Sequence, residues 1–226
     1  MTSVSLLGAA SYMPKNVVPN EFFVKGEQEA KSPMFRGAKT RHHVSEEESA
    51  SFMIEQAASR LGDNLNLNFE KDVDILLTNV TCLDMPFTGD GAGVSHALGM
   101  KPSWIMDIHN AGCVSFIYMM RIAKTLIDSG QARTALICNV QNTAGRVFSH
   151  PDLRSRPQSA IPGDGCGVGY LAASEVSPIK SICTESFGKY AKDMKVVNEE
   201  NEDWWAPRKK PMYVDFSENK VASIVM

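Results

Sequence analysis

Cys113 has the surroundings that most favour chemistry in this sequence. It lies in residues 107–116, Asp-Ile-His-Asn-Ala-Gly-Cys-Val-Ser-Phe, after an apolar run over 104–106 that predicts a strand. The apolar run over 114–129 predicts a helix that ends at Gly130. A thiol at a helix N-terminus meets unpaired N–H groups and the positive end of the helix dipole, which favour the reactive thiolate. The pattern predicts either a nucleophile or a small core cysteine, and by itself it does not choose between them.

The helix that follows Cys113 carries almost no polar residue in its first two turns. A helix that is apolar all round is typical of a buried position. We therefore expect the thiol to face a dry interior, in which an acyl group could be held.

The remaining pattern predicts the elements that must position this cysteine. Strands are expected over 4–9, 73–80, 104–106, 134–140 and 168–173, and weaker extended segments over 179–187 and 212–216. Helices are expected over 22–24 with Asn20 as cap, from a capping box at Ser45 to near Gly62, over 92–98 and 114–129, and from 219 onward. Strands that alternate with helices indicate an α/β sheet covered on both faces.

Composition excludes several classes of function. The chain of 226 residues suffices for one large domain or two small ones, and its net charge of −3 gives no support to nucleic-acid binding. No run of 18 apolar residues predicts a membrane span, and the N-terminus lacks the basic and apolar regions of a signal peptide. The five cysteines show no paired spacing, which argues against a zinc site and a disulfide framework and favours a cytoplasmic location.

Residues 163–167, Gly-Asp-Gly-Cys-Gly, form a second glycine-rich segment. They lack the Lys-Ser/Thr pair and the following helix of a phosphate-binding loop. We expect a tight turn that shapes a site, with Cys166 as a packing residue.

Three landmarks, in order, resemble one known family. They are the cysteine turn, the strand Ala-Leu-Ile-Cys-Asn-Val over 135–140, and Gly-Asp-Gly-Cys-Gly-Val-Gly-Tyr-Leu over 163–171. Together they resemble β-ketoacyl-acyl carrier protein synthase III and its relatives in the thiolase superfamily. Residues 7–14 and 37–42 are similar to the opening of that family. The resemblance favours Cys113 as a nucleophile.

The resemblance implies a thiolase-like fold in which two α/β halves pack as αβαβα layers. Residues 1–217 would form the N-terminal half that carries the nucleophile, and residues 218–226 would begin a second half. In this family the catalytic histidine and asparagine belong to the second half. Their expected positions therefore lie beyond residue 226, and neither is assigned here.

The implied activity is acyl transfer from acyl-coenzyme A or an acyl carrier protein to Cys113. The acyl group would then pass to a second thioester, by decarboxylative Claisen condensation, or to another nucleophile, in fatty-acid or polyketide-type metabolism. We expect no bound cofactor or metal, a coenzyme A or phosphopantetheine thioester as substrate, and a homodimer or heterodimer. The alternative is a non-catalytic half-subunit or fragment that needs a partner chain.

The resemblance also implies roles for other residues. Phe87 matches a loop that closes the partner subunit's acyl pocket, against the alternative of ordinary loop packing. Gly163, Asp164 and Gly165 would shape the substrate site. His109, four residues before the cysteine, is either a local base or a histidine bonded to backbone at a strand end.

Arg36, Arg154 and Arg156 are the candidate anion-binding residues. They could meet the phosphates of coenzyme A or the acidic face of a carrier protein, or they are solvated surface charges. The tryptophan that the family carries shortly before Arg36 is replaced here by Ser-Pro-Met-Phe over 32–35. The basic cluster over 39–43 is expected to be extended and solvated, and Trp204 and Trp205 to anchor a loop.

Overall fold

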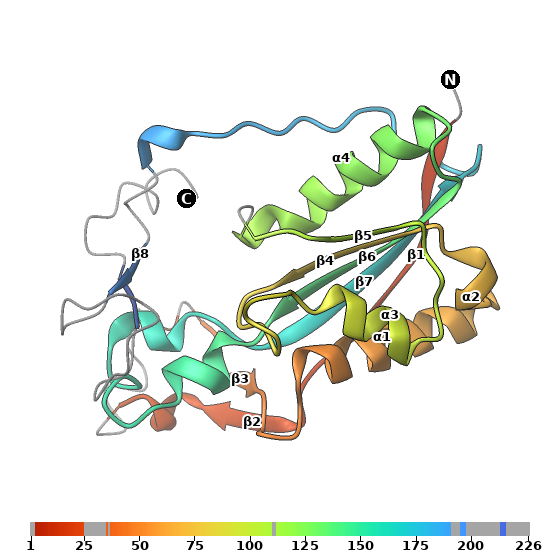
Figure 1. Cartoon of the computed structure of the whole chain (residues 1–226). Coiled ribbons are helices and arrows are strands. Elements are labelled where there is room, and N and C mark those ends of the chain that lie inside the picture. Colours follow the sequence, from red (N-terminus) through yellow and green to blue (C-terminus); the bar gives the residue numbers. More distant parts are fainter. Residues whose placement is uncertain are drawn as a thin grey trace.

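The computed structural model describes residues 3–24, 35, 37–109, 112–190, 195–197 and 213–215 of the chain. A five-stranded sheet lies at its centre (Figure 1), in the order β1-β7-β6-β4-β5. The strands are β1 (Val4–Tyr12), β4 (Ile75–Val80), β5 (Trp104–Asp107), β6 (Thr134–Gln141) and β7 (Gly165–Ala173). Strand β4 pairs in parallel with β5 and β6, whereas β7 is antiparallel to both β6 and β1.

Helices pack on both faces of this sheet, as the sequence predicts (Figure 1). Helices α1 (Ala50–Leu65) and α3 (Gly91–Ala97) lie on one face, and α4 (Ser115–Asp128) lies on the other. The apolar side chains form a separate core on each face, which is why the sheet residues of β4 are buried on both sides.

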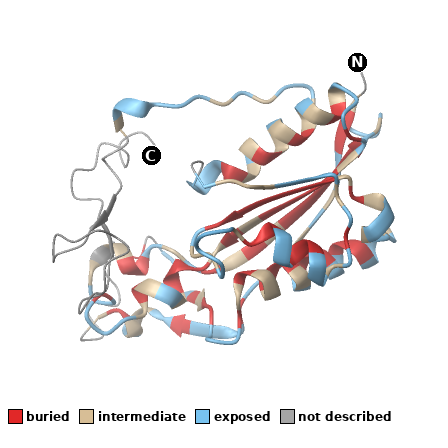
Figure 2. Cartoon of the chain, viewed as in Figure 1, coloured by how far each residue is buried: buried red, intermediate tan, exposed pale blue. Residues whose placement is uncertain are grey.

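Helix α4 buries only one of its faces. Its buried residues are Ser115, Met119, Ala123 and Ile127, one turn apart, whereas Ile117 on another face is 44% exposed. Figure 2 shows exposed and half-buried residues on the side of α4 turned away from the sheet. The prediction that this helix is buried all round is therefore wrong for this chain, because the sheet covers only the stripe of every fourth residue.

The start of α1 differs from the predicted capping box. Ser49 is the N-cap, and its Oγ accepts from the backbone N–H of Phe52 at 3.0 Å. The Glu48 carboxylate does accept from the Ser45 N–H at 2.9 Å, as in a capping box, and also from the Tyr12 hydroxyl at 2.6 Å, but no helix begins at Ser45. Helix α1 also runs to Leu65, beyond the predicted end at Gly62, and α2 (Phe69–Asp72) follows it.

The strands β2 (Asn16–Pro19) and β3 (Thr40–His43) form a second, antiparallel sheet. The cluster over 39–43 is extended, but Arg41 is 6% and His43 is 1% exposed, so the prediction of solvated charges is wrong for these two. The Arg41 guanidinium lies over the rings of Phe23 and Phe35, 5.3 and 5.2 Å from their centroids. Asn20 begins the 3₁₀ helix η1 (Asn20–Phe22) and does not cap it, because Pro19 occupies the cap position.

The rest of the described chain is mostly irregular. The segment 141–162 contains a π-helix, η5 (Ala144–Phe148), and a 3₁₀ helix, η6 (Pro157–Ala160). Residues 179–187 form no strand and lead into η7 (Gly188–Tyr190), whereas the extended segment predicted over 212–216 is confirmed in part by β9 (Tyr213–Asp215), paired with β8 (Lys195–Val197).

Several predictions fall on residues outside the described ranges. These are most of the loop before Arg36, the paired tryptophans, the final helix and the boundary at residues 217 and 218. Over the part of the chain that the structure does describe, no helix combines the length and the apolar composition needed to cross a bilayer.

Candidate active site

Cys113 lies on a 3₁₀ turn, η4 (Gly112–Val114), that leads directly into α4. Cys113 is exposed within the described part of the chain, contrary to the expectation that its thiol faces a dry interior. Gly112 has a φ of +50°, in the left-handed region that favours glycine, and open space surrounds its α-carbon. The predicted position of the thiol, at a strand-to-helix turn, is confirmed.

A small polar cluster lies directly behind this turn. The Ser115 hydroxyl is 2.7 Å from the Gly112 carbonyl oxygen, 2.7 Å from Asn139 Oδ1 and 3.0 Å from Asn79 Oδ1. The Asn79 amide in turn donates to the carbonyl of Ile108. We name Asn79, Ser115 and Asn139 the asparagine–serine cluster.

Sequence reasoning missed this cluster, although a signal was present. Asn79 and Asn139 stand at the same place in two apolar runs, each followed by valine. They are register partners in the parallel pair β4–β6. An asparagine near the end of two neighbouring buried strands is unusual enough to mark a polar site between them.

The loop that carries Phe87 is fixed by carboxylates on both sides. Asp107, at the end of β5, accepts from the backbone N–H groups of Asp90 and Gly91 at 3.1 and 3.0 Å. The buried Asp90 carboxylate accepts from the Met85 N–H at 3.0 Å, and burial raises its pKa. Phe87 lies at the tip of this loop with 98% of its surface exposed. The structure thus presents one large aromatic ring to the outside on an anchored loop.

Asp164 is buried, and its carboxylate accepts hydrogen bonds from the backbone. It accepts from the N–H groups of Val44, Ala144 and Gly145 at 2.7 to 2.8 Å. Burial raises the pKa of this carboxyl, and these hydrogen bonds oppose the rise. Asp164 therefore joins η5 to the segment after β3, a structural role that leaves Gly163 and Gly165 to form the predicted turn.

The strand β7 begins earlier than predicted, at Gly165 rather than after the glycine-rich turn. Cys166 is 3% exposed and its burial raises the pKa of its thiol to about 12, which confirms a packing residue. Because β7 runs against β6, Gly165 pairs with Gln141 at the carboxyl end of β6. This edge therefore gathers the cysteine turn, the Phe87 loop and the 163–165 turn, since the parallel strands β4, β5 and β6 all end there.

The remaining predicted site residues are three arginines and a histidine. Arg154 is exposed, and its guanidinium lies over the ring of Phe22 at 5.3 Å from the centroid. Arg156 is half-buried at the start of η6, His109 is exposed two residues after β5, and Arg36 lies outside the described residues. Within the described ranges, no group of three His, Cys, Asp or Glu side chains could hold a metal ion.

Comparisons with known proteins agree with this arrangement. The family model for 3-oxoacyl-[acyl-carrier-protein] synthase III matches residues 106–188, which include both the cysteine turn and the Gly-Asp-Gly turn. A β-ketoacyl-[acyl-carrier-protein] synthase III of Ehrlichia canis is 30% identical over 171 residues, which cover 75% of this chain and 52% of the relative. By these matches the chain is similar to β-ketoacyl-acyl carrier protein synthase III.

Solved structures show the same fold. The 3-oxoacyl-[acyl-carrier-protein] synthase III of Aquifex aeolicus is 28% identical with a TM-score of 0.65, over 77% of this chain and 55% of that one. The β-ketoacyl-[acyl carrier protein] synthase III of Thermus thermophilus, at 21% identity, superposes with a TM-score of 0.75 over 92% of this chain and 64% of that one. The thiolase-like α/β fold predicted from sequence is confirmed.

This synthase III-like chain spans 52% to 60% of the length of the curated relatives that it matches. The family match over 106–188 contains Cys113, His109, Asp164, Arg154 and Arg156, whereas Phe87 and Arg36 precede it. The roles of these residues stay predictions.

Proposed function

We propose that this chain takes part in acyl transfer of the ketosynthase III type, with Cys113 as the nucleophile. The observation that carries the proposal is the exposed thiol on a left-handed glycine turn at the start of α4. A sulfur there is open to a thioester, and the first backbone N–H groups of the helix have no helical acceptor and can face developing negative charge.

The first step is attack of the Cys113 thiolate on the carbonyl carbon of an acyl thioester. The new C–S bond forms as the bond to the thiol of coenzyme A or of a carrier protein's phosphopantetheine breaks, and the departing thiolate takes up a proton. The backbone N–H of Cys113 is the proposed donor to the oxyanion of the tetrahedral intermediate.

The second step passes the acyl group on. A malonyl thioester loses carbon dioxide, the resulting enolate attacks the acyl carbon, and the Cys113 thiolate leaves. The family resemblance assigns stabilisation of that enolate to a histidine and an asparagine of the second half. Residues 1–217 are proposed as the half that carries the nucleophile, and the pathway as fatty-acid or polyketide-type biosynthesis.

Subunit pairing is part of the proposal. Strand β5 is an edge of the sheet, with Trp104 42% and Ile105 39% exposed, and an unpaired edge favours pairing with a second strand. Phe87, on its anchored loop near the same strand, would then reach a partner's acyl site. A second copy of this chain or a related chain is the proposed partner.

Substrate contacts are proposed for the polar loops of the same edge. Arg154 and Arg156 would meet phosphates of coenzyme A or acidic side chains of a carrier protein, together with Arg36. Gly163 and Gly165 would shape the entrance, with Asp164 holding their turn, and His109 would lie beside the thiol. A cytoplasmic location is consistent with five free cysteines.

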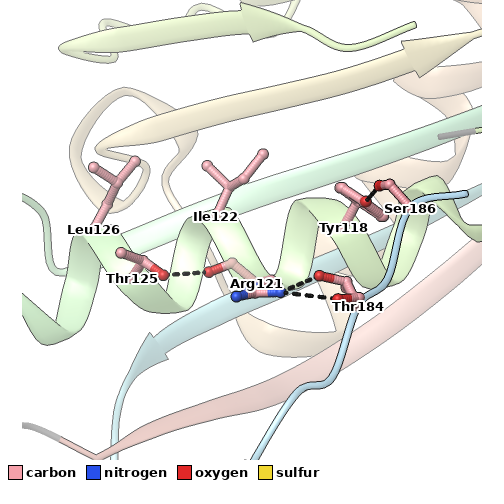
Figure 3. Close-up of a pocket in the computed structure, with 7 residues that line it drawn as sticks. All are labelled: Tyr118, Arg121, Ile122, Thr125, Leu126, Thr184 and Ser186. Carbon is pink, nitrogen blue, oxygen red and sulfur yellow. Dashed lines mark hydrogen bonds between the residues drawn. The ribbon is translucent and has the colours of Figure 1, made fainter. Parts of the chain in front are cut away.

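One observation favours the alternative of a half-subunit. The outer face of α4 and the segment 184–186 border a groove of about 540 Å³ (Figure 3), lined by Tyr118, Arg121, Ile122, Thr125, Leu126, Thr184 and Ser186. Ile122 and Leu126 are only half-buried, although both pack against the core on this side of the sheet. A second half, in the same polypeptide or another, would cover this groove.

Intact-mass spectrometry of the native protein tests both the proposed nucleophile and the half-subunit alternative. After incubation with acetyl- or octanoyl-coenzyme A, the wild-type protein should gain the acyl mass, and Cys113→Ala should gain none. Cys183→Ala, which removes the other exposed thiol, is the matched control and should acylate normally. An unmodified wild-type protein, or acylation that survives in Cys113→Ala, would overturn the nucleophile, and a co-purifying second polypeptide would support the half-subunit.

A further inference from the structure

The asparagine–serine cluster lies between Cys113 and the sheet and has no part in the mechanism above. Ser115 is fully buried and Asn79 is 5% exposed, and Asn139 is half-buried. The three residues come from three elements, α4, β4 and β6, and their side-chain oxygens converge within 2.7 to 3.0 Å of the Ser115 hydroxyl.

Two contacts of this cluster hold the backbone before the cysteine, and Ser115 itself lies two residues after it. Before Cys113, the Asn79 amide donates to the carbonyl of Ile108. Immediately before it, the Gly112 carbonyl lies 2.7 Å from the Ser115 hydroxyl. The path of the backbone from β5 into α4 is therefore tied at both ends to a group that two neighbouring strands hold in register.

Burial of the polar side chains in this cluster costs free energy of folding, so we expect the backbone geometry that they fix to serve a function. All six residues of β4 are buried, and an apolar side chain at Asn79 would avoid the desolvation of an amide. A buried polar network whose members are hydrogen-bonded specifies one arrangement of the backbone around it. Here that backbone carries an exposed thiol.

The geometry points to Asn79, Ser115 and Asn139 as positioning residues that hold the Cys113 sulfur and backbone N–H for acyl transfer. The inference rests on the proposed function. Attack on a thioester requires a fixed distance and orientation between the sulfur and the oxyanion donor. Small displacements of either group slow the acylation strongly. Alkylation of the same thiol by iodoacetamide forms no oxyanion, so its rate does not depend on where the oxyanion donor lies relative to the sulfur.

The test compares two reactions of Cys113 in the full-length protein. Acylation by acetyl- and octanoyl-coenzyme A and alkylation by iodoacetamide are followed by peptide mass spectrometry, with the exposed Cys183 as an internal reference for alkylation. Ser115→Ala should lower the acylation rate about tenfold or more while alkylation changes less than about twofold. Asn139→Ala, at a half-buried position that tolerates truncation better, should likewise slow acylation while alkylation stays nearly unchanged.

Ser5→Ala is the matched control. Ser5 is also fully buried, and its hydroxyl donates to the Ser174 carbonyl at 3.1 Å, near the opposite end of the sheet from Cys113. Neither rate should change in this variant.

The remaining outcomes distinguish failure of the positioning role from failure of the proposed function. Equal loss of both reactions, or unchanged acylation in Ser115→Ala and Asn139→Ala, would overturn the positioning role and leave the proposed function standing. A wild-type protein whose Cys113 is alkylated but never acylated would overturn the proposed function, and the positioning role with it.

Discussion

At the scale of single residues, His43 is a buried titratable group whose protonation affects stability. Its ring packs edge-on against Phe22 and Phe23, at centroid distances of 5.6 and 5.7 Å, and its Nε2 atom has no hydrogen-bond partner among the described residues. Burial, followed by the positive charge of Arg41, lowers the pKa of His43 to about 4. The folded protein therefore holds this imidazole neutral.

The protein should lose stability when the pH falls from 7 to 5. Between about pH 6.5 and about pH 4 the unfolded chain protonates His43 and the folded chain does not, so acid favours unfolding. The expected decrease in the free energy of unfolding is about 2 kcal/mol. Urea denaturation at both pH values measures it, and His43→Gln should lose that part of the dependence. A variant with the wild-type dependence would contradict this assignment.

At the scale of elements, η5 depends on close approach to the segment after β3. A Cβ atom at Gly145 would lie 2.4 Å from the Val44 carbonyl oxygen and 2.7 Å from its nitrogen. These are backbone atoms, which cannot rotate away, and the same two segments share the Asp164 carboxylate. Glycine at this position is what allows the polar loop to close against the sheet edge.

Gly145→Ala should therefore destabilise the protein by about 1–3 kcal/mol, the usual cost of overpacking. Gly93→Ala is the matched control, because the site on α3 has open space within 4 Å and alanine favours a helix by about 0.8–1.0 kcal/mol over glycine. Urea denaturation of both variants would show opposite shifts in midpoint. Equal shifts would contradict the close approach.

At the scale of the whole molecule, the described residues form three surfaces that leave large apolar side chains exposed. They are the β5 edge, the ring of Phe87 and the outer face of α4. Contiguous exposed apolar area on a folded domain indicates contact with another surface. The β5 edge and Phe87 lie together, so one subunit contact could bury both.

Phe87→Ser should weaken self-association about tenfold or more. Burial of a phenylalanine side chain contributes about 1.5–3 kcal/mol, and Phe87 is 98% exposed within the described structure, so the change should disturb little packing there. Sedimentation equilibrium measures the dissociation constant, and Val176→Ser, at another exposed apolar residue, should leave it unchanged. A wild-type protein that stays monomeric at all concentrations would contradict the contact.

The local pattern alone predicted the position of Cys113 and most strands, because apolar runs, helix caps and glycines act over a few residues. The strand over 73–80 and the helix after the cysteine are confirmed as β4 and α4 within two residues at each end. The predicted capping box at Ser45 does not start the helix, which begins after Ser49. Glu48 accepts from the Ser45 N–H as such a box requires, and it also accepts from Tyr12, 36 residues away.

Tertiary structure decided the features that depend on register and on long-range contact. Asn79, Asn139 and Ser115 meet only because β4 and β6 pair in register beneath α4, and Asp164 is structural only because Val44 and η5 reach it from distant parts of the chain. The apolar sequence of α4 predicted burial on all sides, yet only the fold shows which face the sheet covers. A sequence specifies how apolar a helix is, whereas the neighbours that cover it are set by the assembly of the whole molecule.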